Sequence, residues 1–250
     1  MNWWRRKKRN SLKVGERSAV GQVRSENQDA CAHLTDERDA GVNLCIVADG
    51  MGGHDDGREA STLAVEIVGE VFFEMAGEPI PHRLQRSLEA ANVAIWNRSN
   101  GRAGRRMGTT CTTLALNEAG AFIAHAGDSR AYRITRKRME QLTQDHTVVQ
   151  EMMQAGILTE DEAAVHPKRN ALTRALGMDD TIEVDVLPEL PLQARDRYLL
   201  CSDGLLLVDE QEIYQIVREH TPQEACDQLV ARANERGGHD NITAMVIALP

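Results

Sequence analysis

The most constraining feature of this sequence is an aspartate that recurs where a strand is expected to end. Residues 44–47 are apolar, as in a buried strand, and they lead through Asp49 into a turn with Gly50, Gly52 and Gly53. Glycine can adopt turn conformations that are closed to other residues. A single Asp-Gly turn after a strand is ordinary, but here the pattern returns. Four further aspartates lie at expected strand ends or loop boundaries: Asp29, Asp128, Asp203 and Asp240.

Hydrophobic periodicity predicts the elements around these aspartates. Apolar residues spaced by about 3.6 positions predict helices over 57–74 and 82–97, and a capped start at Thr221 predicts another helix that ends near Gly237. Because helices and strands come in blocks, we expect a layered α/β fold of the α+β kind with mainly antiparallel sheets. Runs rich in β-forming residues predict strands over 43–49, 110–116, 121–126, 131–134, 182–187, 197–202 and 242–248.

The length of 250 residues suits one large domain over 15–250, preceded by a basic tail over 1–14. Residues 146–177 separate two β-rich regions, which predicts a mobile insert. The five cysteines are scattered and form no C-x-x-C pair, so neither a disulfide framework nor a thiolate zinc site is indicated. No apolar run approaches the roughly 20 residues of a membrane helix. We therefore expect a cytoplasmic protein, and a monomer.

The charge of the chain is unevenly distributed. The formal net charge is −9, yet six cations precede Gly15 with no acid among them. The acidic body argues against nucleic-acid binding. The tail suits a solvated terminus, and with Trp3 and Trp4 beside its basic run it also suits a weak contact with an anionic membrane surface. It lacks the apolar core of a signal peptide.

Acidic side chains brought together at strand ends would repel one another unless cations lay between them. Oxygen ligands without a His or Cys cluster favour Mg²⁺ or Mn²⁺ over Zn²⁺. Two such ions about 3.5 to 4 Å apart can share a water, lower its pKa and promote in-line displacement at phosphorus. Arg24 suits this chemistry, because a guanidinium can bind two phosphate oxygens at once. These residues indicate metal-dependent hydrolysis of a phosphate ester.

Seven motifs follow one another along the chain: Arg24 to Asp29, Ala48 to His54, Gly108 to Thr110, Gly127 to Arg130, Leu172 to Gly177, Ser202 to Gly204 and Gly238 to Thr243. In this order they resemble the motifs of the bacterial metal-dependent serine/threonine phosphatases, the protein phosphatase 2C (PPM) family. The resemblance spans about 15–249, nearly the whole chain. It implies a sandwich of two antiparallel sheets flanked by helices, with the metals in a cleft at one end.

The resemblance also implies a metal centre of Mn²⁺ or Mg²⁺, with two ions in the active site and a position for a third. Asp49 would bridge the two metals, and the carbonyl of Gly50 would bind the second. Asp203 and Asp240 would hold the first metal. Asp128, together with Asp203, matches the third metal position of bacterial members.

Two further residues and one segment take roles from the same resemblance. Asp29 would orient the metal-bound water, and Arg24 would bind the phosphate of the substrate. Residues 146–170 correspond to the flap that borders the cleft in this family. The implied substrates are proteins phosphorylated on serine or threonine. The enzyme would therefore reverse the action of a bacterial Ser/Thr kinase.

The chain departs from the family pattern at two points. Gln28 stands where many members have Glu, which removes one charge near the second metal. Eukaryotic members carry a His proposed as general acid, and no motif here supplies a clear match. His54 is close to Asp49 in sequence, but this proximity does not aim it at the leaving oxygen, so the general acid stays unassigned.

Three alternatives compete with this interpretation. Cys226 and Arg232 fit the C-x₅-R spacing of cysteine-dependent phosphatases, but that chemistry needs a loop of backbone N–H groups around phosphate, whereas this segment is expected to be helical. A regulatory module that binds phosphoproteins without turnover is disfavoured because all the metal-binding aspartates are present. A metal phosphodiesterase acting on nucleotides is disfavoured by the order of the motifs.

Overall fold

The computed structural model of this chain describes residues 12–53, 55–100 and 107–250. The basic tail up to residue 11, His54 and the loop expected at 101–104 lie outside the described residues. In the described part, no helix is long and apolar enough to cross a bilayer.

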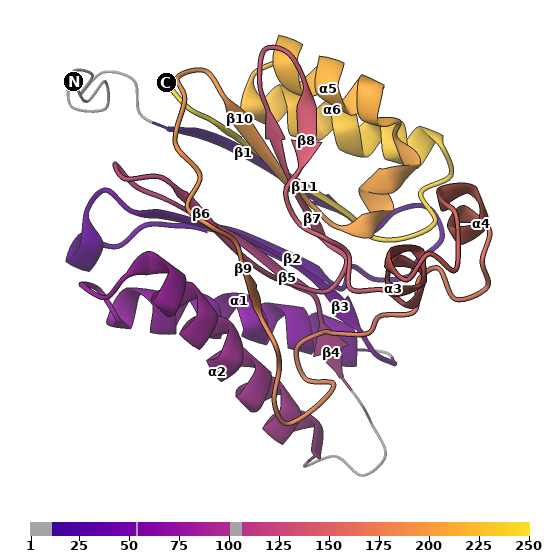
Figure 1. The fold of residues 1–250 in the computed structure, drawn as a ribbon, viewed down its shortest axis with the longest axis horizontal. Coiled ribbons are helices and arrows are strands. Elements are labelled where there is room, and N and C mark those ends of the chain that lie inside the picture. Colours follow the sequence, from indigo (N-terminus) through magenta and orange to yellow (C-terminus); the bar gives the residue numbers. More distant parts are fainter. Residues whose placement is uncertain (1–11, 54, 101–106) are drawn as a thin grey trace.

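Two antiparallel sheets lie face to face (Figure 1). The first sheet has the strand order β1 (Lys13–Ala19), β11 (Ile242–Ala248), β10 (Arg197–Cys201), β7 (Arg130–Ile134) and β8 (Met139–Gln141). The second sheet has the order β2 (Asp29–Leu34), β3 (Asn43–Met51), β5 (Cys111–Leu116), β6 (Ala121–Ala126) and β9 (Asp185–Val186), and β4 (Gly108–Thr109) pairs with the end of β3.

Helices cover the outer face of each sheet (Figure 1). The second sheet packs against α1 (Asp56–Glu74) and α2 (Ile80–Asn100), and the first packs against α5 (Glu210–Glu219) and α6 (Pro222–Glu235). The expected sandwich of two sheets flanked by helices is therefore confirmed. Shorter elements are the 3₁₀ turns η2 (Glu37–Asp39) and η3 (Asp203–Leu207), and α3 (Val148–Gln154) and α4 (Glu160–Ala164) within the expected insert.

Local sequence signals explain where several elements begin. Thr221 accepts a hydrogen bond from the backbone N–H of Glu224, whose side chain bonds back to Thr221, so α6 starts with the predicted capping box. The strand predicted over 182–187 is wrong in extent, because only Asp185–Val186 pairs with β6. Ile182 and Val184 instead pack against the core beneath α1 and α2. Their apolar side chains are therefore partly buried although the two residues do not pair in a strand.

The alternation of side chains along the strands builds three core layers. In β3, Leu44, Ile46 and Ala48 pack toward α1 and α2, whereas Cys45 and Val47 pack between the sheets. In β11 the even-numbered residues 242, 244 and 246 face α5 and α6, and the odd-numbered 245 and 247 face the other sheet. Since the period of a strand is two, Asp49 and Thr243 continue the rows that lie between the sheets.

A neutral histidine is buried in the second sheet. His125 in β6 is fully buried, with Nε2 3.1 Å from the carbonyl of Gln144 and Nδ1 2.9 Å from Oγ1 of Thr112. A carbonyl can only accept, so Nε2 carries the proton. Burial, together with the nearby ring of His146, lowers the pKa of His125 to about 3.

We predict that His125 weakens the fold in acid. An unfolded histidine titrates near about pH 6.5, so between that pH and about 3 the unfolded chain binds a proton that the folded chain does not. The free energy of unfolding should fall by up to about 2 kcal/mol through this group between pH 7.5 and pH 5. Urea unfolding in EDTA at both pH values should show this loss in the wild type and a smaller one in His125→Gln.

The matched control is His33→Gln, which changes an exposed histidine of β2 and should follow the wild type. Equal pH dependence in His125→Gln and the wild type would contradict the prediction.

Candidate metal centre

Five aspartates converge at one end of the space between the sheets. Asp29 at the start of β2 pairs directly with Asp49 near the end of β3. Asp203 follows the end of β10, and Asp240 lies two residues before the start of β11, its neighbour in the first sheet. Asp128 lies in the turn between β6 and β7. The structure thus brings all five carboxylates of the sequence prediction to the same edge.

The charges of these residues act on one another. Asp49 keeps some solvent access, yet the protein surrounds it closely, and burial is the first cause that raises its pKa well above the ordinary value. The charges of Asp29, Asp203, Asp128 and Asp240 raise it further. Burial also raises the pKa of Asp29, Asp128 and Asp203. The site is therefore a concentration of negative charge that a cation would relieve.

Two hydroxyl groups fix the carboxylate of Asp29. Oγ of Ser202 donates to Oδ2 of Asp29 at 2.8 Å, and Oγ1 of Thr243 donates to the same oxygen at 2.6 Å. The two hydroxyl residues are themselves joined, because the N–H of Thr243 donates to Oγ of Ser202 at 2.9 Å. These bonds tie the second sheet to the first at the end of the sandwich where the aspartates lie. Oδ1 of Asp29 is also buried, but no donor from the described residues bonds it.

Backbone contacts hold Asp49 in place. Its N–H donates to Oγ1 of Thr110 at 2.9 Å, and its carbonyl accepts from Oγ1 of Thr109 and from the N–H of Thr110, both at 2.9 Å. Oγ1 of Thr110 also lies 2.7 Å from Oγ of Ser129, next to Asp128. The Gly108 to Thr110 motif therefore positions Asp49 and links it to the turn that carries Asp128.

Gly50 lies where the chain has no room for a side chain. Its N–H donates to the carbonyl of Gln28 at 3.1 Å, and Oγ of Ser61 donates to that carbonyl at 2.6 Å. A Cβ on Gly50 would collide with the carbonyl oxygen of Gly57 in α1. The first turns of α1 thus press against the strand end, and only glycine permits this approach. The amide of Gln28 donates to Oε1 of Glu26 at 3.1 Å.

Arg24 lies at the entrance of the site. Its Nη2 is 2.7 Å from Oδ2 of Asp240, and 53% of its side chain is exposed. The hydrogen bond to Asp240 raises the pKa of Arg24 above its ordinary value, so the guanidinium stays charged. Asn241 holds the loop that carries Arg24, since it accepts from the N–H of Gln28 and donates to the carbonyls of Val20 and Glu26.

Sequence reasoning missed three contributors. Asp145 forms a two-point ion pair with Arg130 at 2.9 and 2.7 Å, and its charge helps to raise the pKa of Asp128. Ser202 and Thr243 were read only as parts of motifs. The alternation along β10 and β11 could have identified both, because each occupies the row that faces the other sheet. No comparable local signal marks Asp145.

The donor set fits a hard divalent cation. Oδ1 of Asp29 and Oδ1 of Asp203 are buried, and no protein donor in the described ranges reaches either oxygen. Leaving such groups unpaired is costly, and an ion between oxygen ligands would compensate them. Across 12–53, 55–100 and 107–250, no three Asp, Glu, His or Cys side chains form a ready-made ligand set, so an ion would draw the carboxylates closer together.

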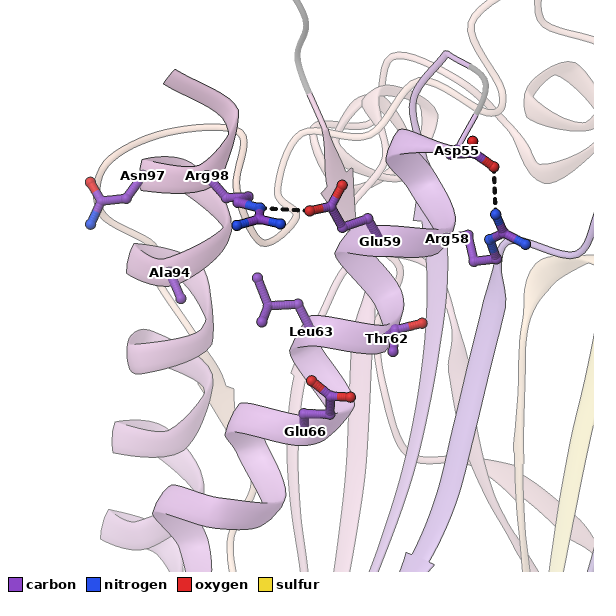
Figure 2. Close-up of a pocket in the computed structure, with 9 residues that line it drawn as sticks. All are labelled: Asp55, Arg58, Glu59, Thr62, Leu63, Glu66, Ala94, Asn97 and Arg98. Carbon is purple, nitrogen blue, oxygen red and sulfur yellow. Dashed lines mark hydrogen bonds and ion pairs between the residues drawn. The ribbon is translucent and has the colours of Figure 1, made fainter. Parts of the chain in front are cut away.

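Two cavities differ in their relation to this centre. A cavity of about 760 Å³ is lined by Asp128, Asp145 and Asp203 together with Met153 and Arg169 of the insert. A second of about 800 Å³ lies between α1 and α2, and Figure 2 shows that its cations face acids. There Nε of Arg98 is 2.6 Å from Glu59 and Arg58 pairs with Asp55. Of these two cavities, the first is the one lined by aspartates of the metal centre, Asp128 and Asp203.

Cys226, which fits the C-x₅-R spacing, does not lie in a phosphate-binding loop. Cys226 is buried within α6, and its Sγ lies 3.2 Å from the carbonyl of Gly15. Burial raises the pKa of this thiol to about 12. A nucleophilic cysteine needs a lowered pKa and access to substrate, so the structure agrees with its exclusion.

Comparison with known proteins agrees with this geometry. The family described as Protein phosphatase 2C matches residues 21–237. Serine/threonine phosphatase stp of Listeria monocytogenes is 35% identical over 243 residues, which cover 92% of this chain and 93% of that protein. The S. agalactiae serine/threonine phosphatase has a similar structure, with a TM-score of 0.87 and 33% identity over 96% of this chain and 100% of the other.

A third relative was solved with metal bound. The catalytic domain of serine threonine protein phosphatase PstP, in complex with two manganese ions, matches with a TM-score of 0.81 and 31% identity over 96% of this chain and 99% of the other. Together with the match over most of the length, these likenesses identify the fold and the type of enzyme. The chain therefore belongs to the protein phosphatase 2C family of enzymes.

Proposed function

We propose that this enzyme hydrolyses phosphoserine and phosphothreonine in proteins with the help of two divalent metals, Mn²⁺ or Mg²⁺. The observation that carries the proposal is the convergence of five aspartates at one end of the sandwich, where two buried carboxylate oxygens receive no hydrogen bond from the part of the chain that the structure describes. The manganese-bound relative supports the choice of cofactor. Such a site needs positive charge before it can accept an anionic phosphate.

Each ligand has a proposed place. Asp49 would contact both metals, the carbonyl of Gly50 would contact the second, and Asp203 with Asp240 would hold the first. Asp128 and Asp203 would provide the position for a third ion. When bound, the two metals lower the pKa of a water between them and offset the charge that develops at phosphorus.

Asp29 would orient the attacking water and accept its proton. Ser202 and Thr243 occupy Oδ2, so Oδ1 is the oxygen left for this role. Because two hydroxyls hold one oxygen, the other is held in a defined direction.

Arg24 would bind the phosphate of the substrate. The guanidinium is half-exposed at the entrance, and among the described residues Asp240 is the acid that it bonds, through Nη2. Its remaining donors suit phosphate oxygens. The insert over 146–170 would act as a flap beside the bound phosphoprotein, because its residues line the cavity that opens onto the aspartates. A Ser/Thr kinase in the cytoplasm would phosphorylate the same proteins that this enzyme dephosphorylates.

Replacing a metal ligand should abolish turnover. We predict that Asp49→Asn and Asp240→Asn each lower manganese-dependent hydrolysis of a phosphothreonine peptide by at least about 100-fold, because each removes a charged oxygen that offsets the cation. Manganese should also raise the Tm of the wild type and raise that of Asp49→Asn less.

The matched control is Asp227→Asn on the exposed surface of α6, which should keep both the activity and the metal-dependent shift in Tm. A folded wild type without turnover in Mn²⁺ or Mg²⁺ would refute the proposed function. Faster hydrolysis of cyclic dinucleotides than of phosphopeptides would point to a phosphodiesterase.

The hydroxyl groups that hold Asp29 should affect catalysis and not substrate binding. We predict that Thr243→Val lowers kcat by about 10- to 100-fold and leaves KM nearly unchanged, because the lost hydroxyl bonds Asp29 and does not touch the substrate. Steady-state kinetics with a phosphothreonine peptide at saturating Mn²⁺ would measure both constants.

Thr113→Val provides the control, since it removes a buried hydroxyl that bonds only within the β5 and β6 pair. It should retain the wild-type kcat. If Thr243→Val and Thr113→Val lose activity equally, the effect comes from general destabilisation and the role given to Asp29 is wrong.

A further inference from the structure

The turn that carries Asp128 is bonded at both of its ends by two consecutive residues, Asp145 and His146. The N–H of Gly127 donates to Nδ1 of His146 at 3.1 Å, and the N–H of His146 donates to the carbonyl of Gly127 at 2.8 Å. Asp145 forms its two-point ion pair with Arg130, the last residue of the same motif. The position of Asp128 therefore depends on bonds made by its neighbours in the chain.

Gly127 has little freedom to move away from His146. Its φ of 113° lies in the region that favours glycine, and a Cβ there would lie 2.6 Å from side-chain atoms of Thr110. On the other side of Asp128, Oγ of Ser129 lies 2.7 Å from Oγ1 of the same threonine. The turn thus contacts Thr110 as well as His146, and a shift of the histidine ring would be passed to Asp128.

A second layer of contacts fixes the ring of His146. Because Nδ1 accepts a backbone N–H, Nε2 carries the proton of the neutral ring and donates to Oδ2 of Asp185 at 3.1 Å. Oδ1 of Asp185 accepts from Nη1 of Arg174 at 2.8 Å. Burial lowers the pKa of His146, which favours the neutral form that these bonds require. The ring is therefore held in one orientation by groups on both of its nitrogens.

These contacts use the motif Leu172 to Gly177, which supplies none of the proposed metal ligands. Arg174 of this motif bonds Asp185, and Thr173 donates its N–H to the carbonyl of His146 at 2.9 Å. Asp185 belongs to β9 at the edge of the second sheet, where it pairs with His125 of β6. A chain of side-chain bonds thus runs from the motif, through the edge strand and His146, to the turn.

The same contacts separate His146 from the role of general acid. Only 5% of the residue is exposed, and its two ring nitrogens are engaged by Gly127 and Asp185. A general acid must come within hydrogen-bond reach of the leaving oxygen of the substrate, whereas this ring bonds to the protein through both nitrogens. Its contribution is to the geometry of the site.

We propose that His146, oriented by Asp185 and Arg174, is a positioning residue for Asp128 and thereby for the third divalent ion. This role rests on the proposed function, in which Asp128 and Asp203 provide the position of that ion. Replacing a residue that orients a metal ligand typically lowers metal affinity by about 10- to 100-fold. The other two ions would take no ligand from this turn, so their affinity should change less.

Hydrogen exchange tests the contact in EDTA, without any metal. In enzyme labelled with ¹⁵N-glycine, the amide of Gly127 should exchange at least about tenfold faster in His146→Leu than in the wild type, because leucine has no acceptor. His146→Asn should keep most of the protection, since its side-chain oxygen can replace Nδ1. The amide of Gly69, on the buried face of α1, is the internal reference for global unfolding. An unchanged ratio of the two exchange rates in His146→Leu would overturn the proposal.

Calorimetric titration with Mn²⁺ tests the consequence for the metal centre. His146→Leu should weaken the weakest Mn²⁺ site by at least about tenfold and the tighter sites by no more than about threefold, and His146→Asn should lie closer to the wild type. Asp185→Ala should weaken the same site. Its matched control is Asp196→Ala, which removes an ion pair with Arg133 in the first sheet and should bind Mn²⁺ as the wild type does.

Asp128→Asn identifies the site on which the histidine acts. This variant should lose the weakest Mn²⁺ site, and adding His146→Leu to it should cause no further loss if the histidine acts through Asp128. Further weakening in the double variant, retention of the weakest site in Asp128→Asn, or an unchanged weakest site in His146→Leu would each overturn the role of His146 and leave the two-metal function standing. A wild type that binds no Mn²⁺ would overturn both.

Discussion

The fold brings together carboxylates that repel one another. This repulsion is the constraint to which the rest of the structure responds. Burial and the charges of four other aspartates raise the pKa of Asp49, which means that the protein alone does not satisfy this site. Such a cluster costs stability unless protons or cations compensate it. The divalent ions proposed above would compensate this charge and would also help to activate the attacking water. The electrostatic cost of bringing these carboxylates together and the chemistry of the proposed reaction therefore have the same physical origin.

The surrounding structure holds Asp49, Gly50 and Asp29 through atoms other than those proposed to contact metal or water. Threonine hydroxyls and backbone groups hold Asp49, α1 leaves space only for glycine at position 50, and Ser202 with Thr243 occupies one oxygen of Asp29. Because these contacts hold Asp49, Gly50 and Asp29 rigidly, the oxygens proposed to contact metal or water point in defined directions. The contacts also join the two sheets at the mouth, so the stability of the sandwich and the geometry of the site rest on the same bonds.

The first sheet separates two electrostatic environments by the length of its strands. Its acidic end adjoins the proposed metals, and the exposed cations Arg136, Lys137, Arg138 and Arg195 lie at its opposite end. Because antiparallel neighbours alternate in direction, loops at one end come from every second connection along the chain. Residues far apart in sequence, such as Arg136 and Arg195, can in this way form one surface.

The sequence by itself determined the layered fold, the family, the type of enzyme and the residue types at the strand ends, because hydrophobic period, glycine position and the order of motifs are local properties. It also indicated that five aspartates belong together. Only the tertiary structure decided what holds them: the bonds from Ser202 and Thr243 to Asp29 join residues separated by 173 and 214 positions. The same applies to Asp145 beside Asp128 and to the short β9. Sheet pairing and register set these contacts, and no local pattern encodes which strand lies beside which.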